Sequence, residues 1–410
     1  MIGAVGAIAV RTLGALALAA GLAGAAAAEP DPKDWDAVLE AARGRTVWFH
    51  AWGGSTRIND YVAWAGREVA DRFGVRLEHV KLSDTASAVS RVAAEKAAGK
   101  DAGGAVDLIW INGENFAAMK ENGLLFGPWA EDLPNWRFVD VEGKPAVVSD
   151  FTVPTEGLEA PWGMAQLVFF HDAARAPAPP RSMAELAAWA EANPGRFAYP
   201  APPNFLGSTF LKQALLELAT DPAALSRPVE AADYEAVTAP LWAFLAELTP
   251  NLWRSGRAYP RNGPRLVQLM ADGEIDLALS FNPNEAASAI ANFELQETVE
   301  TYVLSGGTIG NASFVAIPFN ANAKAAAMVV ANFLLSPEAQ ARKADPAVWG
   351  AGTVLDVDGL PEDARAAFDA VEVGPGGVAP EDLGRVRPEP HPSWMVRLEE
   401  DWTRRYGVSR

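Results

Sequence analysis

The 410-residue chain contains no cysteine, which excludes disulfide bonds, thiolate metal ligands, catalytic thiols and a lipid-modified N-terminal cysteine. Histidine is scarce as well, and His50, His79, His171 and His391 are too dispersed to indicate a metal cluster. Basic residues are outnumbered: 34 Lys and Arg stand against 52 Asp and Glu, for a net charge of −18. This balance argues against nucleic-acid binding.

The common enzyme signatures are missing too. The sequence has no GxxxxGK[ST] phosphate loop, no GxSxG nucleophile elbow and no HExxH zinc helix. His171-Asp172 could form a catalytic pair, but its place at the end of a predicted strand fits a structural role equally well. We therefore expect a protein that is not an enzyme and has no cofactor. A hydrolase remains the alternative.

The N-terminus predicts a cleaved secretory signal over residues 1–28. From Leu13 to Ala28 the chain holds only Leu, Ala and Gly, and it ends in four alanines before Glu29-Pro30. An apolar stretch that ends in small residues is typical of a signal peptide. A membrane anchor is the alternative, but the stretch is short for a span of about 20 apolar residues. Export without an anchor indicates the periplasm of a Gram-negative bacterium.

The remaining chain predicts an α/β fold with two domains, since about 380 residues can form two separate cores. Apolar strands over 47–52, 75–80 and 106–111 are separated by helices with one apolar face. This β-α-β-α-β order implies parallel strands joined by right-handed crossovers. Further predicted elements are a strand over Trp162–His171, a helix over Ser182–Glu191 with Ser182 as N-cap, and a strand over Ile275–Phe281.

Two segments share one layout of a buried strand, an Asn/Glu loop and a helix. They are Val106–Asn115 and Ile275–Glu285. Open α/β sheets bind ligands where strands end near helix N-termini, so we interpret the two loops as equivalent positions in two similar lobes. Helix capping explains each loop alone equally well. The candidate ligand-binding residues of these loops are Asn112, Glu114, Asn115, Asn282, Asn284 and Glu285.

Other candidates lie in glycine- and hydroxyl-rich segments and at isolated tryptophans. In Trp52–Thr56 two glycines allow a ligand close to the backbone, and Trp52 offers a stacking face. In Phe205–Thr209 a glycine and two hydroxyls precede a predicted helix, as an N-cap or an anion seat. A tryptophan near a domain crossing could line a cleft or pack. These segments add Trp52, Gly53, Gly54, Ser55, Trp162, Ser208, Thr209 and, more weakly, Asn262 to the candidate ligand-binding residues.

The order of these segments resembles the bacterial ABC-transporter periplasmic solute-binding proteins, and the YnjB-type group in particular. The stretches that carry the resemblance are WFHAWGGSTRINDY, DLIWINGENFAAMKENGLLFGPW, WGMAQLVFFHD and GEIDLALSFNPNEA. The resemblance implies a type II periplasmic-binding fold with two lobes, each a mostly parallel sheet flanked by helices. It further implies a cleft that closes around the ligand at a hinge, a monomer, and an inner-membrane ABC permease as partner. The expected division is lobe 1 over 29–163 and 306–370, lobe 2 over 164–305, and a C-terminal helical segment over 371–410.

The same resemblance implies a small polar solute. Because the YnjB-type group is linked to thiamine transport, a thiamine-like cation is expected, and tryptophan faces and Glu114 suit such a ligand. A polyamine stays open. A phosphorylated or zwitterionic metabolite also stays open, because Gly53–Thr56 and Gly207–Thr209 could seat an anion. A sensor or adaptor with the same fold remains a further alternative, since fold alone does not determine function.

Overall fold

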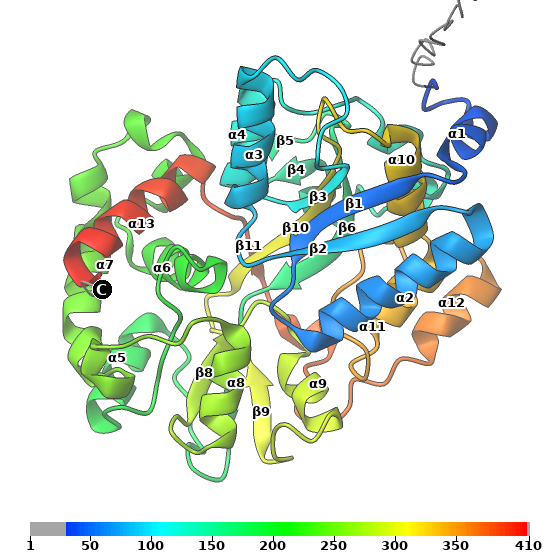
Figure 1. Cartoon of the computed structure of the whole chain (residues 1–410). Helices are drawn as coiled ribbons and strands as arrows, with labels where there is room; N and C mark the ends of the chain where they lie inside the picture. Colours follow the sequence, from blue (N-terminus) through cyan, green and yellow to red (C-terminus); the bar gives the residue numbers. More distant parts are fainter. Residues whose placement is uncertain (1–29, 408–410) are drawn as a thin grey trace, which may run out of the picture.

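Two hydrophobic cores organise the computed structural model, which describes residues 30–407 (Figure 1). The first core holds buried residues from 38–162 and 312–360, and the second from 167–309 and 394–402. We call the parts around them lobe 1 and lobe 2. The signal peptide predicted over residues 1–28 lies outside the described residues. Between residues 30 and 407 no helix is both long and apolar enough to cross a membrane.

Lobe 1 contains a six-stranded sheet with the order β11-β10-β3-β1-β2, and β6 pairs with β10 beside this path. The β1, β2 and β3 strands are parallel, as the β-α-β-α-β pattern predicts. β10 runs antiparallel to both β3 and β6. The strands are β1 (Thr46–Trp52), β2 (Arg76–Leu82), β3 (Leu108–Ile111), β6 (Glu159–Gln166), β10 (Thr308–Ala316) and β11 (Val386–Arg387).

Helices cover this sheet because their apolar residues recur every three or four positions. In α2 the side chains of Ile58, Tyr61, Val62 and Val69 are buried on one face, and the helix ends at Gly74, whose φ is 67°. A short hairpin, β4 (Ser149–Asp150) and β5 (Val153–Pro154), completes the lobe. The helices are α1 (Trp35–Ala42), α2 (Thr56–Phe73), α3 (Ala86–Ala97), α4 (Glu114–Glu121), α10 (Lys324–Leu334), α11 (Pro337–Ala344) and α12 (Glu362–Asp369).

Lobe 2 is built on a three-stranded sheet with the order β8-β7-β9. The strands are β7 (Val168–Asp172), β8 (Leu277–Ser280) and β9 (Val299–Tyr302). Both neighbours of β7 are antiparallel to it, so the expectation of a mostly parallel sheet is wrong for lobe 2, whereas the α/β two-lobed class is confirmed. The lobe 1 sheet is mixed because the chain leaves it on β6 and returns to it on β10, which runs antiparallel to β6 and β3.

The predicted strand Trp162–His171 is in fact two strands. β6 belongs to the sheet of lobe 1, β7 to that of lobe 2, and Leu167 separates them. β6 pairs antiparallel with β10 from Glu159 opposite Ala316 to Gln166 opposite Gly310. This pair connects the two lobes. An apolar run of ten residues shows no break in its sequence pattern, because both halves are buried.

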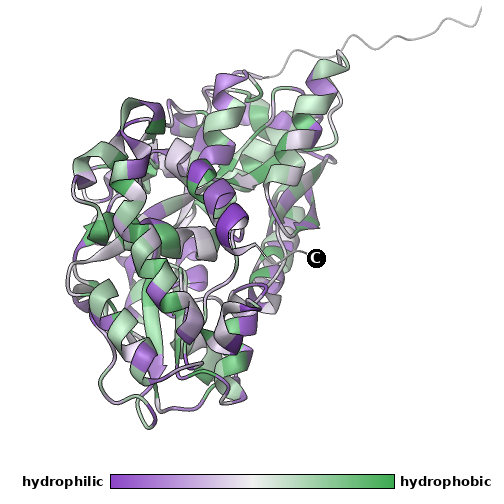
Figure 2. Ribbon diagram, turned by 90° about the vertical axis from the view of Figure 1, so that its left-hand side faces the viewer, coloured by the Kyte–Doolittle hydropathy of each residue, from purple (hydrophilic) through white to green (hydrophobic). Residues whose placement is uncertain are grey.

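Helices of lobe 2 surround its sheet, and Figure 2 shows their mixed hydrophilic and hydrophobic turns. α6 begins at Phe205, so the expected loop Phe205–Thr209 is the first turn of a helix. Gly207 is needed there for packing: a Cβ would lie 2.0 Å from the Pro200 carbonyl oxygen. The helices are α5 (Met183–Ala192), α6 (Phe205–Leu218), α7 (Tyr234–Leu248), α8 (Gly263–Ala271), α9 (Glu285–Ala291) and α13 (Pro392–Tyr406).

The C-terminal helix α13 packs into the second core through Trp394, Leu398 and Trp402. It also contacts α4 of lobe 1 and α6 of lobe 2. In Figure 1 it lies along the side of the molecule where those two helices approach each other. The last residues of the fold therefore take part in the contact between the lobes.

Candidate functional site

The loop before α9 joins lobe 2 to lobe 1 by hydrogen bonds. The Asn282 amide nitrogen donates to the Trp349 carbonyl at 3.0 Å, and Asn284 donates to the Gly350 carbonyl at 2.9 Å. The Ser288 hydroxyl donates to Trp349 as well, at 3.1 Å. Trp349 belongs to the first core and Ser288 lies on α9, so these bonds cross between the lobes. In this conformation, the amide donors of both predicted asparagines are used by the protein itself.

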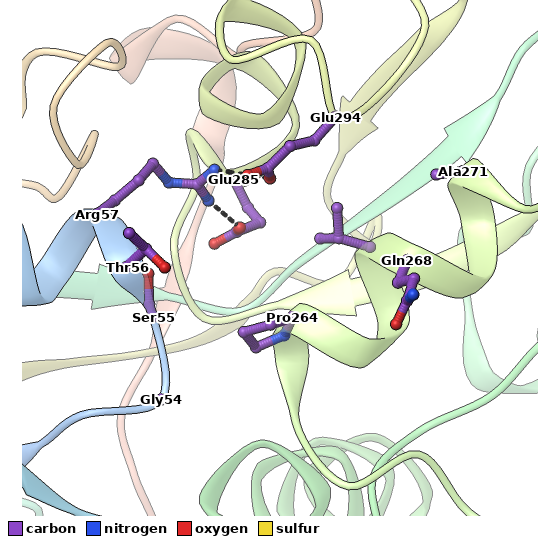
Figure 3. Close-up of a pocket in the computed structure, with 10 residues that line it drawn as sticks. Gly54, Ser55, Thr56, Arg57, Pro264, Gln268, Ala271, Glu285 and Glu294 are labelled. Atoms are coloured by element: carbon purple, nitrogen blue, oxygen red, sulfur yellow. Dashed lines mark hydrogen bonds and ion pairs between the residues drawn. The ribbon is translucent and has the colours of Figure 1, made fainter.

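Arg57 adds an ion pair across the same gap (Figure 3). From the first turn of α2 its guanidinium reaches Glu285 at the start of α9, and its Nη1 lies 3.0 Å from Glu294. The Arg57 and Glu285 side chains are only 15% and 20% exposed, which strengthens their attraction relative to a surface pair. Glu285 therefore holds lobe 1 rather than standing free for a ligand.

A cavity of about 350 Å³ lies beside this ion pair, between the two lobes. Its lobe 1 wall is Gly54–Arg57, which overlaps the predicted segment Trp52–Thr56, and Figure 3 shows Ser55 and Thr56 directed toward the opening. Its lobe 2 wall is α8 with the two glutamates. The lobe 2 lining residues are Pro264, Val267, Gln268, Ala271, Glu285 and Glu294.

A second interlobe feature is a group of carboxylates around one buried ammonium. We define the carboxyl cluster as Glu114, Asp150, Glu389 and Glu399, with Lys212 as the basic side chain that acts on all four. Three structural units contribute: α4 and the β4–β5 turn of lobe 1, α6 of lobe 2, and the C-terminal segment around α13. The cluster therefore assembles only when both lobes and the C-terminal segment come together.

The lobe 1 side of the cluster is fixed by a tight turn at Gly113. Its φ is 63°, a conformation that favours glycine, and a Cβ would lie 2.6 Å from the Phe151 ring. The Gly113 N–H donates to Asp150 Oδ2 at 2.7 Å. Phe151 itself has a positive φ of 54°. An aromatic residue in this region is strained, and such strain is concentrated at functional sites.

Burial controls the charge of the lobe 1 carboxyls. It raises the pKa of Glu114 to about 7, and nearby Glu399 adds to the shift. Asn115 donates to Glu114 Oε1 at 2.6 Å, whereas Oε2 is buried and has no hydrogen-bond partner among the described residues. Burial also raises the pKa of Asp150 well above its ordinary value, against the opposing hydrogen bond from Gly113. The attraction of Lys212 lowers both pKa values but does not offset the effect of burial.

Lys212 supplies the lobe 2 contribution and is fully buried. Its Nζ lies 2.7 Å from Glu389 Oε2, and Glu389 Oε1 accepts a hydrogen bond of 2.9 Å from Asn311 on β10. The ammonium also lies 4.3 Å from the centre of the Phe151 ring and 5.2 Å from that of Phe205. A cation between two aromatic faces and a carboxylate is held by cation–π attraction and an ion pair together.

Ser208 and Glu399 complete the cluster from α6 and α13. The Ser208 hydroxyl donates to Glu399 Oε1 at 2.5 Å. Burial raises the pKa of Glu399 to about 7, although this hydrogen bond and Lys212 oppose the shift. Phe205, Ser208 and Lys212 follow one another at helical spacing along α6, so one face of this helix points at the cluster.

The structure brings together some of the predicted site residues and separates others. Glu114, Asn115 and Ser208 meet at the carboxyl cluster; Gly54, Ser55 and Glu285 line the cavity. Several others have local roles in this conformation. The Gly53 carbonyl accepts a hydrogen bond from the Asn59 side chain, and the Thr209 hydroxyl donates to the Phe205 carbonyl. Asn262 caps α8 by accepting the Arg265 N–H. Trp52 packs over Gly54, and Asn112 lies before the Gly113 turn.

Trp162 lies in the first core rather than on an open wall. It is 1% exposed and packs against Trp110 and Trp349, with ring centres 4.8 and 5.4 Å apart. Lys343 on α11 lies 5.1 Å from its ring and is fully buried. The packing role that the sequence left open for this tryptophan is therefore the one seen here.

Sequence reasoning missed much of the carboxyl cluster. Asp150 and Phe151 lie in a segment without a periodic pattern, Lys212 is in the middle of an apolar helix, and Glu389 and Glu399 are near the C-terminus. One signal was available: a lysine among Phe210–Leu218 is a charge on a helix that is otherwise largely buried. Within the part of the chain that the structure describes, no group of three His, Asp or Glu side chains is arranged to hold a metal ion.

Comparison with known proteins identifies close and distant relatives. Residues 67–357 match the model of the bacterial extracellular solute-binding protein family. The protein YnjB of Escherichia coli strain K12 is 47% identical over 375 residues, which are 92% of this chain and 94% of YnjB.

Solved structures share the fold at much lower sequence identity. A Listeria monocytogenes protein assigned to spermidine/putrescine ABC transport has a TM-score of 0.64 at 16% identity, covering 89% of this chain and 99% of its own. The periplasmic binding protein AfuA of Actinobacillus pleuropneumoniae, with fructose-6-phosphate bound, has a TM-score of 0.61 at 16% identity, with coverages of 89% and 99%. At such identities the likeness concerns the fold alone, and the solutes named for these two proteins differ in charge.

Proposed function

The chain belongs to the family of bacterial extracellular solute-binding proteins, and we propose that it captures a small organic cation between its two lobes. As a member of this family it is the solute-binding component of an ABC transporter and not an enzyme. Its partners are therefore a small-molecule solute and an ABC permease. The identity of the solute is the proposed step.

The charge balance of the carboxyl cluster carries the proposal. Glu114, Asp150, Glu389 and Glu399 face one ammonium, that of Lys212. Because Lys212 pairs with Glu389, three carboxyls remain without an equivalent cation. Burial raises the pKa of each, so the protein holds protons where a positively charged solute would supply the missing charge. Phe151 and Phe205 add aromatic faces that favour a cation.

A thiamine-like thiazolium and a polyamine both fit this chemistry, because each presents positive charge and an apolar body. The charges of these side chains suit an anionic solute less well. Two basic side chains at the interlobe contact, Lys212 and Arg57, are paired with glutamates. A phosphorylated metabolite that bound to Lys212 or Arg57 would have to break that pair, and at the carboxyl cluster it would meet the like charge of the remaining carboxyls.

The cellular setting and the lobe division form part of the proposal. The signal predicted over residues 1–28 would deliver a monomer to the periplasm of a Gram-negative bacterium, where cleft closure at the β6–β10 pair retains the solute. Lobe 1 comprises 29–163 and 306–370, and lobe 2 comprises 164–305. The packing of α13 on the second core supports adding this helix to lobe 2, whereas β11 pairs with β10 in the lobe 1 sheet.

A thermal-shift screen of refolded, ligand-free protein tests the proposed function. The panel contains thiamine, spermidine, putrescine, γ-aminobutyrate and fructose-6-phosphate. A ligand that binds the folded state raises the melting temperature, by about 2.7 kcal/mol of stabilisation at a hundredfold excess over its Kd. We expect stabilisation by one or more of the cations. Stabilisation by fructose-6-phosphate alone would contradict the proposal.

A matched pair of variants connects any shift to the carboxyl cluster. Glu114→Gln removes a buried carboxyl, whereas Glu121→Gln changes an exposed one at the other end of α4. We expect the first variant to weaken cation binding and the second to leave it unchanged. Equal effects of the two variants would place the solute elsewhere.

A further inference from the structure

Lys212 is an unusual occupant of the site at which the proposed function places a cation. It is fully buried on α6, yet its ammonium lies among groups that suit a free organic cation: a carboxylate of Glu389 and the rings of Phe151 and Phe205. Lysine heads are normally in water, and burial without compensation is costly. The site thus already contains a cation that belongs to the protein.

The contacts of Lys212 come from different parts of the fold. Phe151 belongs to the β4–β5 turn of lobe 1, Phe205 to α6 of lobe 2, and Glu389 is bound to Asn311 on the crossing strand β10. Separation of the lobes would take Phe151 away from the ammonium, whereas Phe205 is on the same helix as Lys212. The side chain is long and unbranched, so the ammonium can move while the helix stays in place.

We propose that Lys212 is an internal counter-ion that occupies the cation position in the ligand-free protein, and that the solute binds by displacing it. The inference rests on the proposed function and adds a selectivity residue to it. The displaced ammonium stays near Glu389, and the solute takes over Phe151, Phe205, Glu114 and Glu399. A solute must then compete with a tethered cation, so weakly interacting cations such as Na⁺ or K⁺ are excluded.

Removal of the competitor should tighten binding. If the position is free of Lys212 in about a tenth of the molecules, Lys212→Met lowers the Kd of a cation about tenfold. Lys212→Arg keeps a tethered positive charge at this position and should not tighten cation binding as Lys212→Met does. Glu389→Gln releases the ammonium from its anchor toward the remaining carboxyls and should raise the Kd. A purely structural role of the ion pair predicts that Lys212→Met and Glu389→Gln shift the Kd in the same direction.

The experiment is a calorimetric titration of full-length mature protein with thiamine and with putrescine, and with fructose-6-phosphate as the anionic probe. Circular dichroism checks that each variant is folded, and Lys212→Gln replaces Lys212→Met if the latter does not fold. Tighter cation binding by the Met or Gln variant with weaker binding by Glu389→Gln supports displacement.

Two other outcomes distinguish displacement of Lys212 from the proposed capture of a cation. If the wild type binds a cation and the neutral Lys212 variants bind it equally or more weakly, displacement is wrong and the proposed function stands. If no folded form binds a cation, and fructose-6-phosphate binds the wild type but not Lys212→Met, both proposals fail and Lys212 is an anion-binding residue.

Discussion

The affinity for a cation should depend steeply on pH around neutrality. Burial raises the pKa values of Glu114 and Glu399 to about 7, so both carboxyls lose their charge as the pH falls through this range. A cation binds the ionised forms. When the pH falls from about 8 to about 6, protonation of one such carboxyl lowers the association constant for the cation about tenfold. Protonation of both carboxyls lowers it about a hundredfold.

The assay is titration calorimetry with thiamine, whose thiazolium charge does not titrate, at half-unit steps from about pH 6 to pH 8. In Glu114→Gln one titrating carboxyl is gone, so the dependence should fall to about tenfold. Glu121→Gln, on the exposed end of α4, should retain the wild-type slope. An association constant that stays constant over this range, or that rises as the pH falls, would refute the reasoning.

The raised pKa of Glu114 also predicts how the stability of the ligand-free protein depends on pH. The pKa of Glu114 is about 7 in the folded protein against an ordinary value of 4.5, so the folded state holds the proton longer than the unfolded state. The contribution of Glu114 to the free energy of unfolding is therefore largest below about pH 4.5. This contribution, about 3 kcal/mol, is lost as the pH rises to about 7. Glu114→Gln should flatten that part of the pH profile of unfolding.

Three further substitutions test other parts of the structure. Arg57→Ala removes the partly buried ion pair between the lobes and should lower the free energy of unfolding by about 2 kcal/mol and expand the ligand-free protein in small-angle scattering; unchanged scattering would mean that the pair does not hold the lobes together. Gly113→Ala combines a positive φ with a contact of 2.6 Å to Phe151 and should cost about 2 kcal/mol in urea unfolding, whereas a neutral effect would show that Phe151 moves aside. Burial lowers the pKa of Lys343 below its ordinary value of 10.5, so the buried side chain increasingly destabilises the folded state as the pH falls below 10.5. Lys343→Met should therefore raise the melting temperature at about pH 7. A lower melting temperature would reveal a favourable interaction of the ammonium with the Trp162 and Trp349 rings.

The sequence predicts the local fold well because periodic patterns and caps act over a few residues. The helix predicted over Ser182–Glu191 is α5, and Ser182 caps it by accepting the Glu185 N–H, as expected. Sheet direction was harder. A buried strand reads the same whether its neighbours are parallel or antiparallel, so nothing in Trp162–His171 revealed the change of lobe within it.

The candidate site was predicted only where it follows a strand end. Glu114 was found because it stands at the junction of β3 and α4. Asp150, Lys212 and Glu389 have no common local pattern, since the separation between them in sequence reaches more than half of the chain and only the folded lobes bring them together. Asn282 and Asn284 show the opposite case: their polar character was recognised, but their hydrogen bonds to Trp349 and Gly350 depend on tertiary structure.

Native mass spectrometry of the mature protein in one competing mixture can decide whether the interlobe carboxyl cluster binds a cation. Ligand-free protein is mixed with equal concentrations of thiamine, spermidine, γ-aminobutyrate and fructose-6-phosphate, and the retained adduct is identified by its mass. We expect an adduct with thiamine or spermidine that is diminished in Glu114→Gln. A fructose-6-phosphate adduct that is unaffected by this substitution would contradict the assignment of the interlobe carboxyl cluster as a cation site.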